Sequence, residues 1–69
     1  MNTYTAVVKE DQGWWYGWVE EVPGVNAQEA SREELMASLK DCLVEALEMN
    51  RDEARKAAES DYSEESIAL

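Results

Sequence analysis

The sequence has no histidine and a single cysteine, Cys42, among its 69 residues. A Ser-His-Asp or Cys-His arrangement needs a histidine, and a zinc site needs several cysteine or histidine ligands, so both classes of site are excluded. A lone thiol also excludes a disulfide within the chain. Cys42 falls on an apolar helical stripe, described below, and we therefore expect a small buried side chain in a reducing compartment.

Long apolar runs and basic residues are also scarce. No run approaches the roughly 20 apolar residues that cross a bilayer, and the first residues lack the pattern of a signal peptide, so we expect a cytoplasmic protein without membrane contact. The chain has six basic and sixteen acidic residues, which gives a formal charge of −10. This charge repels phosphates and attracts basic proteins, so we expect no direct DNA or RNA binding. The alternative is an acidic surface that serves solubility alone.

Carboxylates are the remaining side chains that could act in catalysis or bind a metal ion, but their positions are unfavourable for both. Glu20 and Glu21 are neighbours in an extended segment, where successive side chains point to opposite faces. Glu10 and Asp11 fall where we expect a hairpin turn, and the three glycines form no phosphate-binding loop. We therefore predict no catalytic, metal or cofactor site and no enzyme. A metal-dependent nuclease that uses Asp11, Glu20 or Glu21 is the least favoured alternative.

Short β-favouring segments fill the first half of the chain. Runs of aromatic and β-branched residues predict strands at residues 3–8, 14–19 and 25–28. Gly13 closes the polar run between the first two strands, as a hairpin residue with positive φ does. Pro23 and Gly24 supply the fixed and the permissive φ of a tight turn before the third strand. These segments predict an antiparallel meander.

One long helix follows the strands. Ser31 and Glu34 have the spacing of a capping box, so the helix is expected to start at about Arg32. An apolar stripe then recurs at three- and four-residue steps through Leu35, Met36, Leu39, Cys42, Leu43, Ala46 and Leu47. Nothing breaks the helix before Ser60. About 27 helical residues measure roughly 40 Å, so the last turns overhang the sheet, fray or contact another molecule.

These segments define one α+β domain. Residues 1–58 form a three-stranded antiparallel meander packed on one long helix, and residues 59–69 form an acidic tail. A weak strand signal at residues 67–69 leaves a fourth strand open, which would make the order β-β-β-α-β. A domain this small is marginally stable, and self-association is the stabiliser still available to it.

The aromatic strand predicts an interface. Trp14, Tyr16 and Trp18 share one face of an extended strand, whereas Trp15, Gly17 and Val19 share the other. One helix covers one face, and Gly17 favours the second face because it permits a close approach. We therefore expect the first face to be open, with Ala6 beside it, and to contact a second copy or another protein. The candidate interface residues are Tyr4, Val8, Trp14, Tyr16 and Trp18. The alternative is that Ile67 and Leu69 fold over this face.

Residues 11–28, DQGWWYGWVEEVPGVNAQ, followed by the capped helix SREELMASLKDCLVEAL, resemble the HicB-type antitoxins of toxin–antitoxin pairs. The resemblance implies a partial ribonuclease-H-like fold, with any fourth strand beside the first, and assembly as a dimer or tetramer. Where that family usually has glycine after the third strand, this chain has Glu29. The chain ends in an acidic tail, so we expect a short form without the DNA-binding domain and without operator binding.

The resemblance also implies a function. HicB-type proteins bind and silence HicA-type toxins, which are small basic ribonucleases that cut messenger RNA. We therefore expect a non-enzymatic, antitoxin-like protein that self-associates and neutralises such a toxin. The alternative is a solitary HicB-like oligomeric scaffold that has no toxin partner.

Overall fold

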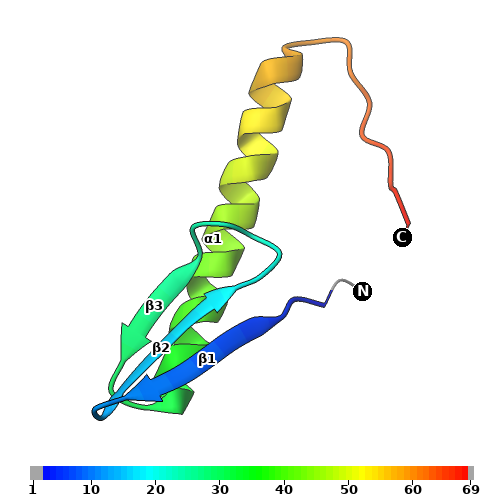
Figure 1. The fold of residues 1–69 in the computed structure, drawn as a ribbon. Coiled ribbons are helices and arrows are strands. Elements are labelled where there is room, and N and C mark those ends of the chain that lie inside the picture. Colours follow the sequence, from blue (N-terminus) through cyan, green and yellow to red (C-terminus); the bar gives the residue numbers. More distant parts are fainter. Residues whose placement is uncertain (1–2, 69) are drawn as a thin grey trace.

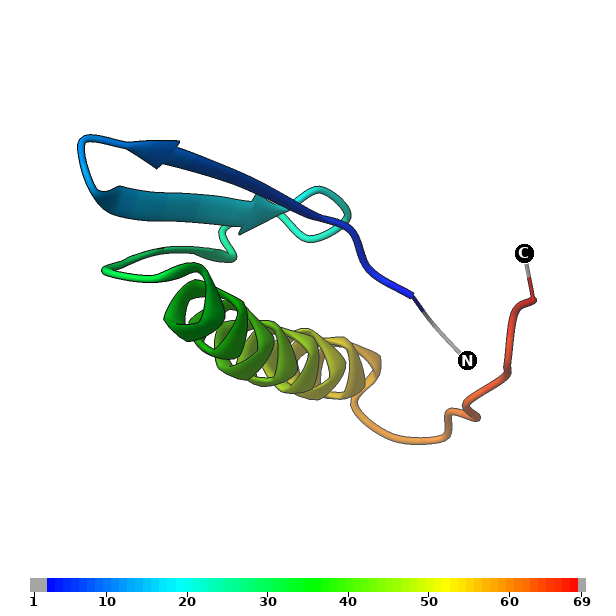
Figure 2. The ribbon, with the colours of Figure 1, turned by 90° about the horizontal axis from the view of Figure 1, so that it is seen from below.

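The computed structural model describes residues 3–68 and contains three strands followed by one helix. Strands β1 (Ala6–Asp11), β2 (Trp14–Val19) and β3 (Asn26–Glu29) form an antiparallel sheet in the order β1-β2-β3, and helix α1 spans Arg32–Ala58. The helix lies against one face of the sheet and leaves the other face uncovered (Figures 1 and 2). The α+β architecture predicted from the sequence is confirmed.

The first hairpin is tighter than predicted. Gln12 and Gly13 have φ values of 52° and 85°, so they form a two-residue turn with positive φ at both positions, and Asp11 pairs directly with Trp14. Strand β1 consequently starts and ends three residues later than the predicted strand at residues 3–8. Glu10 and Asp11 belong to a paired strand rather than to a turn, because pairing with β2 outweighs their weak intrinsic strand preference.

The connection between β2 and β3 is a compact loop. The backbone N–H of Val25 donates to the carbonyl oxygen of Val22 at 3.4 Å across Pro23 and Gly24, and Gly24 has a φ of 91°. Proline followed by a residue with positive φ is typical of a type II turn, so the predicted turn is confirmed. Val22 and Val25 are both buried, and β3 starts at Asn26, one residue later than predicted.

Both ends of α1 are capped. Ser31 has extended backbone angles, and its Oγ accepts the N–H of Glu34 at 3.2 Å, which confirms the predicted N-terminal cap. At the other end Glu59 has a φ of 63°, and its N–H donates to the carbonyl oxygens of Arg55 and Lys56 at 3.2 Å each. The helix therefore has the 27 residues that were expected.

The core lies between α1 and the β2–β3 side of the sheet. Leu35 and Leu39 are fully buried against Val19 and the two valines of the loop. Gly17 lies directly beneath them: a Cβ atom added there would stand 2.9 Å from Leu39 Cδ1 and 3.1 Å from Leu35 Cδ2. The prediction that Gly17 permits a close helix approach is confirmed, and so is the assignment of Trp15 and Val19 to the helix side.

The second half of α1 extends beyond the sheet (Figure 1). Residues 48–58 are all exposed, and the radius of gyration is 15.2 Å. A compact domain of this length has a radius of about 11 Å. Within residues 3–68, no helix combines the length and the apolar character that a membrane crossing requires.

The tail turns back beside the end of the helix. Arg55 Nε donates to Glu64 Oε1 at 2.6 Å, and this exposed ion pair raises the pKa of Arg55 and lowers the pKa of Glu64. Ile67 is 87% exposed, and neither Ile67 nor Ala68 belongs to a strand. Leu69, the last residue of the fourth strand that the sequence left open, lies outside the described residues.

Candidate protein-binding face

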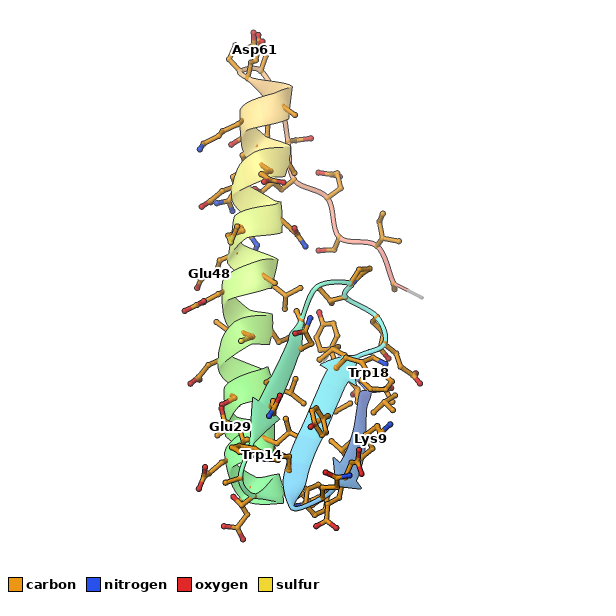
Figure 3. The ribbon with its side chains drawn as sticks, turned by 60° about the vertical axis from the view of Figure 1, so that its left-hand side comes forward. Lys9, Trp14, Trp18, Glu29, Glu48 and Asp61 are labelled. Carbon is orange, nitrogen blue, oxygen red and sulfur yellow. The ribbon has the colours of Figure 1, made fainter. Side chains whose placement is uncertain are left out.

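The face of the sheet opposite α1 is the candidate site, and we call it the open face. Cross-strand partners share a face, and the pairs Val7–Trp18, Lys9–Tyr16, Tyr16–Gln28 and Trp18–Asn26 assign its members. The open face consists of Val7, Lys9, Asp11, Trp14, Tyr16, Trp18, Asn26 and Gln28. Lys9 and Trp18 lie on the far side of the sheet from the helix (Figure 3).

Two of the five interface residues predicted from the sequence are not on this face. Val8 pairs with Gly17, and both Val8 and Tyr4 are partly buried against the core on the helix side, as is Ala6. The prediction that these three residues lie beside the exposed tryptophans was wrong. The reason is the length of the hairpin turn. A two-residue turn pairs even-numbered residues of β1 with odd-numbered residues of β2, so Ala6 and Val8 share the face of Val19 and Gly17 rather than that of the exposed tryptophans.

The other three predicted residues form the aromatic part of the open face. Trp14 and Trp18 are 47% and 43% exposed, and Tyr16 between them is half-buried. A shallow hollow with a volume of 440 Å³ lies next to them, and its lining includes Lys9, Asp11, Tyr16, Trp18 and the two amide side chains of β3. Sequence reasoning missed Val7, Lys9 and Asp11 of β1 and the two amides, Asn26 and Gln28, of β3. The exact length of the first hairpin turn was the signal that could have identified the three residues of β1.

Charge is distributed unevenly between the two sides of the molecule. Lys9 and Asp11 are the only charged residues of the open face, and their charges cancel. The outer side of α1 instead carries an acidic stripe, within an arc of about 60° at 100° per residue. The acidic stripe consists of Glu34, Asp41, Glu45, Glu48 and Asp52, all exposed. Glu48 points away from the sheet (Figure 3), so the stripe and the open face lie on opposite sides.

Two acidic side chains near the ends of the strands have structural contacts, and one of them, Glu21, was weighed for chemistry. Glu21 Oε1 accepts the backbone N–H of Thr5 at 2.7 Å, and this hydrogen bond lowers the pKa of Glu21. Glu29 Oε2 accepts the hydroxyl of Ser38 at 2.7 Å, which ties the end of β3 to α1. Among residues 3–68, histidine, cysteine and acidic side chains form no group of three that could hold a metal ion.

Cys42 is a further correction. The sequence predicted a buried thiol, but Cys42 is exposed. Only Leu35 and Leu39 of α1 are fully buried, because the sheet beneath the helix has three short strands and covers a narrow strip of its surface. Cys42 lies at the flank of that strip, and the apolar spacing alone could not reveal the width of the strip.

Comparison of the chain with models of protein families, with characterised proteins and with solved structures found no match. The likeness to HicB-type antitoxins therefore depends on the residues quoted above and stays a prediction. The site itself is defined by geometry: a neutral aromatic sheet face on one side and an acidic helix stripe on the other.

Proposed function

We propose that this chain is a non-enzymatic protein-binding module of the HicB antitoxin type, which self-associates and neutralises a small basic ribonuclease of the HicA type. The proposal depends on one observation: Trp14 and Trp18 of the open face are nearly half exposed to solvent. Contiguous exposed aromatic surface is typical of protein interfaces, and tryptophan and tyrosine are enriched among the residues that dominate binding.

The charge of the open face favours a protein over a nucleic acid. Single-stranded nucleic acids also stack on aromatic side chains, but their binding sites add a positively charged groove that follows the phosphates. Lys9 is the one basic residue of the open face, and the chain carries a formal charge of −10. The aromatic residues therefore lack the electrostatic partner that a nucleic acid needs.

The acidic stripe supports a basic partner. Its residues follow one another at three- and four-residue steps from Asp41 to Asp52, which covers about 17 Å of helix. A row of negative charges of this kind resembles the phosphates of a nucleic acid strand. A protein that presents such a row competes with RNA for the positive surface of a ribonuclease, and the attraction accelerates association.

A second candidate function is an oligomeric scaffold that has no toxin partner. The observation in its favour is the second half of α1, which extends beyond the sheet (Figure 1): residues 48–58 are all exposed, and Met49 is 62% exposed. Isolated helical segments of this length are marginal in water, so contact with another molecule would stabilise the segment.

The proposal is tested by a search of the neighbouring reading frames for a small basic protein and by co-expression of that protein with this chain. We expect a complex in a pull-down assay and rescue of growth from the toxic protein. The double variant Glu45→Lys, Glu48→Lys should lose rescue, because it reverses the centre of the acidic stripe. The control Glu20→Lys, Glu65→Lys changes the net charge equally at exposed positions off the stripe and should keep rescue.

Failure of the wild-type chain to form a complex and to rescue growth would remove the antitoxin proposal. The absence of an adjacent small basic reading frame, together with a stable oligomer in solution, would favour the scaffold instead.

A further inference from the structure

We infer that a second copy of this chain covers the open face in solution, and that the basic partner binds elsewhere on the molecule. The inference rests on the proposed function, because both begin from the uncovered aromatic face, but it assigns that face to one occupant. The two sides of the molecule differ in charge, and this difference decides between the occupants.

The open face is the neutral part of a strongly acidic molecule. Its two charges, on Lys9 and Asp11, cancel, whereas the whole chain has a formal charge of −10. When two copies meet through their open faces, both acidic stripes point away from the contact. Two sheets that pack face to face lie about 10 Å apart, and each stripe lies beyond its own sheet, so the two stripes are farther apart than the screening length of about 8 Å at physiological salt. The repulsion between the two stripes is therefore largely screened in this arrangement.

A basic partner gains little on the same face. Lys9 and Asp11 both line the hollow, so a positive surface placed there meets one like charge, one opposite charge and no excess of carboxylates. Electrostatic complementarity sets both association rate and partner choice, and it directs a basic protein to the acidic stripe instead.

The shape of the open face also favours contact between two copies of the chain. The open face has a hollow of 440 Å³ and, beside it, two indoles that are 47% and 43% exposed. A surface that holds both a hollow and projecting groups can complement itself across a two-fold axis, as symmetric dimers require. Pairing through the sheet edges is less favourable: Lys9, Glu10 and Asp11 put charges on β1, and β3 has four residues.

The exposed area leaves room for such a contact. The chain exposes 5864 Å². A compact protein of 7.8 kDa exposes about 4,400 Å². The excess of about 1,500 Å² is larger than the roughly 800 Å² that each partner loses in a standard interface. This excess belongs to the whole chain, including the protruding half of α1, and from a face of three short strands we expect a dimer that dissociates on dilution.

Sedimentation velocity across a dilution series of the full chain tests the inference. Gln28→Glu and Trp18→Glu each add one negative charge to the open face, and each should raise the dimer dissociation constant at least tenfold. Two controls add the same charge elsewhere: Gln12→Glu in the hairpin turn, and Val44→Glu at a helix position that is 48% exposed. Each control should change the dissociation constant less than threefold.

Two features keep this test informative. Gln28→Glu is isosteric at an exposed position, so it separates loss of the dimer from loss of the fold if Trp18→Glu unfolds the chain. Added salt should strengthen the dimer, because it screens repulsion between two acidic molecules, whereas it should weaken any complex with a basic protein. Indole emission should shift to shorter wavelength as concentration rises.

The outcomes of the two proposals are distinguishable. A wild-type chain that stays monomeric at the highest concentration, or a dimer that Gln28→Glu leaves unchanged, overturns the inference while the rescue assay still decides the antitoxin function. The inference is also overturned if Gln28→Glu loses toxin binding while the control Gln12→Glu keeps it, because the basic partner would then occupy the open face. Failure of rescue with an intact, salt-strengthened dimer removes the antitoxin function alone.

Discussion

Gly17 is the position where a single methyl group should disturb the contact between sheet and helix. An added Cβ would lie 2.9 Å from Leu39 Cδ1 and 3.1 Å from both Leu35 Cδ2 and the carbonyl oxygen of Val7. Leu35 and Leu39 are 0% and 2% exposed, so their methyl groups have little room to move away. Overpacking of this kind costs about 1–3 kcal/mol.

The net loss is smaller than that cost. Replacing glycine within a strand recovers about 0.5–1 kcal/mol of backbone entropy. We therefore expect Gly17→Ala to lower the free energy of unfolding by about 1 kcal/mol, out of a total of about 3–10 kcal/mol for a domain of this size. The corresponding fall in Tm is about 4–8 °C. Thermal unfolding followed by far-ultraviolet circular dichroism measures it, at one protomer concentration because association shifts Tm.

A double-mutant cycle identifies the cause. Leu39→Val removes the methyl group nearest to the added Cβ, so Gly17→Ala should cost at least 0.5 kcal/mol less in that background. Gly13→Ala is the control: its strain comes from a φ of 85° with no atom within 4 Å, and its effect should add to that of Leu39→Val. A Gly17→Ala variant as stable as the wild type, or a cycle without coupling, would refute the packing described here.

Three further experiments, one substitution, one pH titration and one chemical modification, test separate parts of the structure. Ser31→Ala removes the cap of the Glu34 N–H and should cost about 1 kcal/mol in unfolding free energy, measured by urea denaturation; an unchanged midpoint contradicts it. The pKa of Glu21 lies below its unfolded value of 4.5, so the hydrogen bond from the Thr5 N–H is complete above pH 4.5 and is lost as pH falls through the folded pKa. The NMR chemical shift of the Thr5 amide should therefore change as pH falls through the folded pKa of Glu21. Glu21→Gln should abolish this change. The Cys42 thiol should react with a disulfide reagent in the folded state, in monomer and dimer alike; a requirement for denaturant contradicts its exposure.

Local rules predicted most of the fold. The cap at Ser31, the turn at Pro23 and Gly24, and the close approach at Gly17 each depend on a few adjacent residues, and all three are present. The aromatic strand was also placed correctly, since its residues favour strands whatever they contact.

Properties that depend on partners were harder to predict. The polar end of β1 looks like a loop in isolation and is extended because β2 lies beside it. The exposure of Cys42 depends on how wide a sheet the helix covers, which no helical period encodes. Three of the five residues assigned to the candidate interface, Trp14, Tyr16 and Trp18, lie on the open face, whereas Tyr4 and Val8 lie on the helix side.

The length of one turn thus determines the chemistry of the open face. With two residues between the strands, Val7, Lys9 and Asp11 join the aromatic residues, and Ala6 and Val8 face the core. One residue more would reverse β1, turn Lys9 and Asp11 toward the helix and move Ala6, Val8 and Glu10 to the open face. That change would take Ala6 and Val8 out of their contact with the core, so the core itself holds the register. The same register gives the open face its balanced pair of charges, and with it a surface on which two acidic molecules can meet.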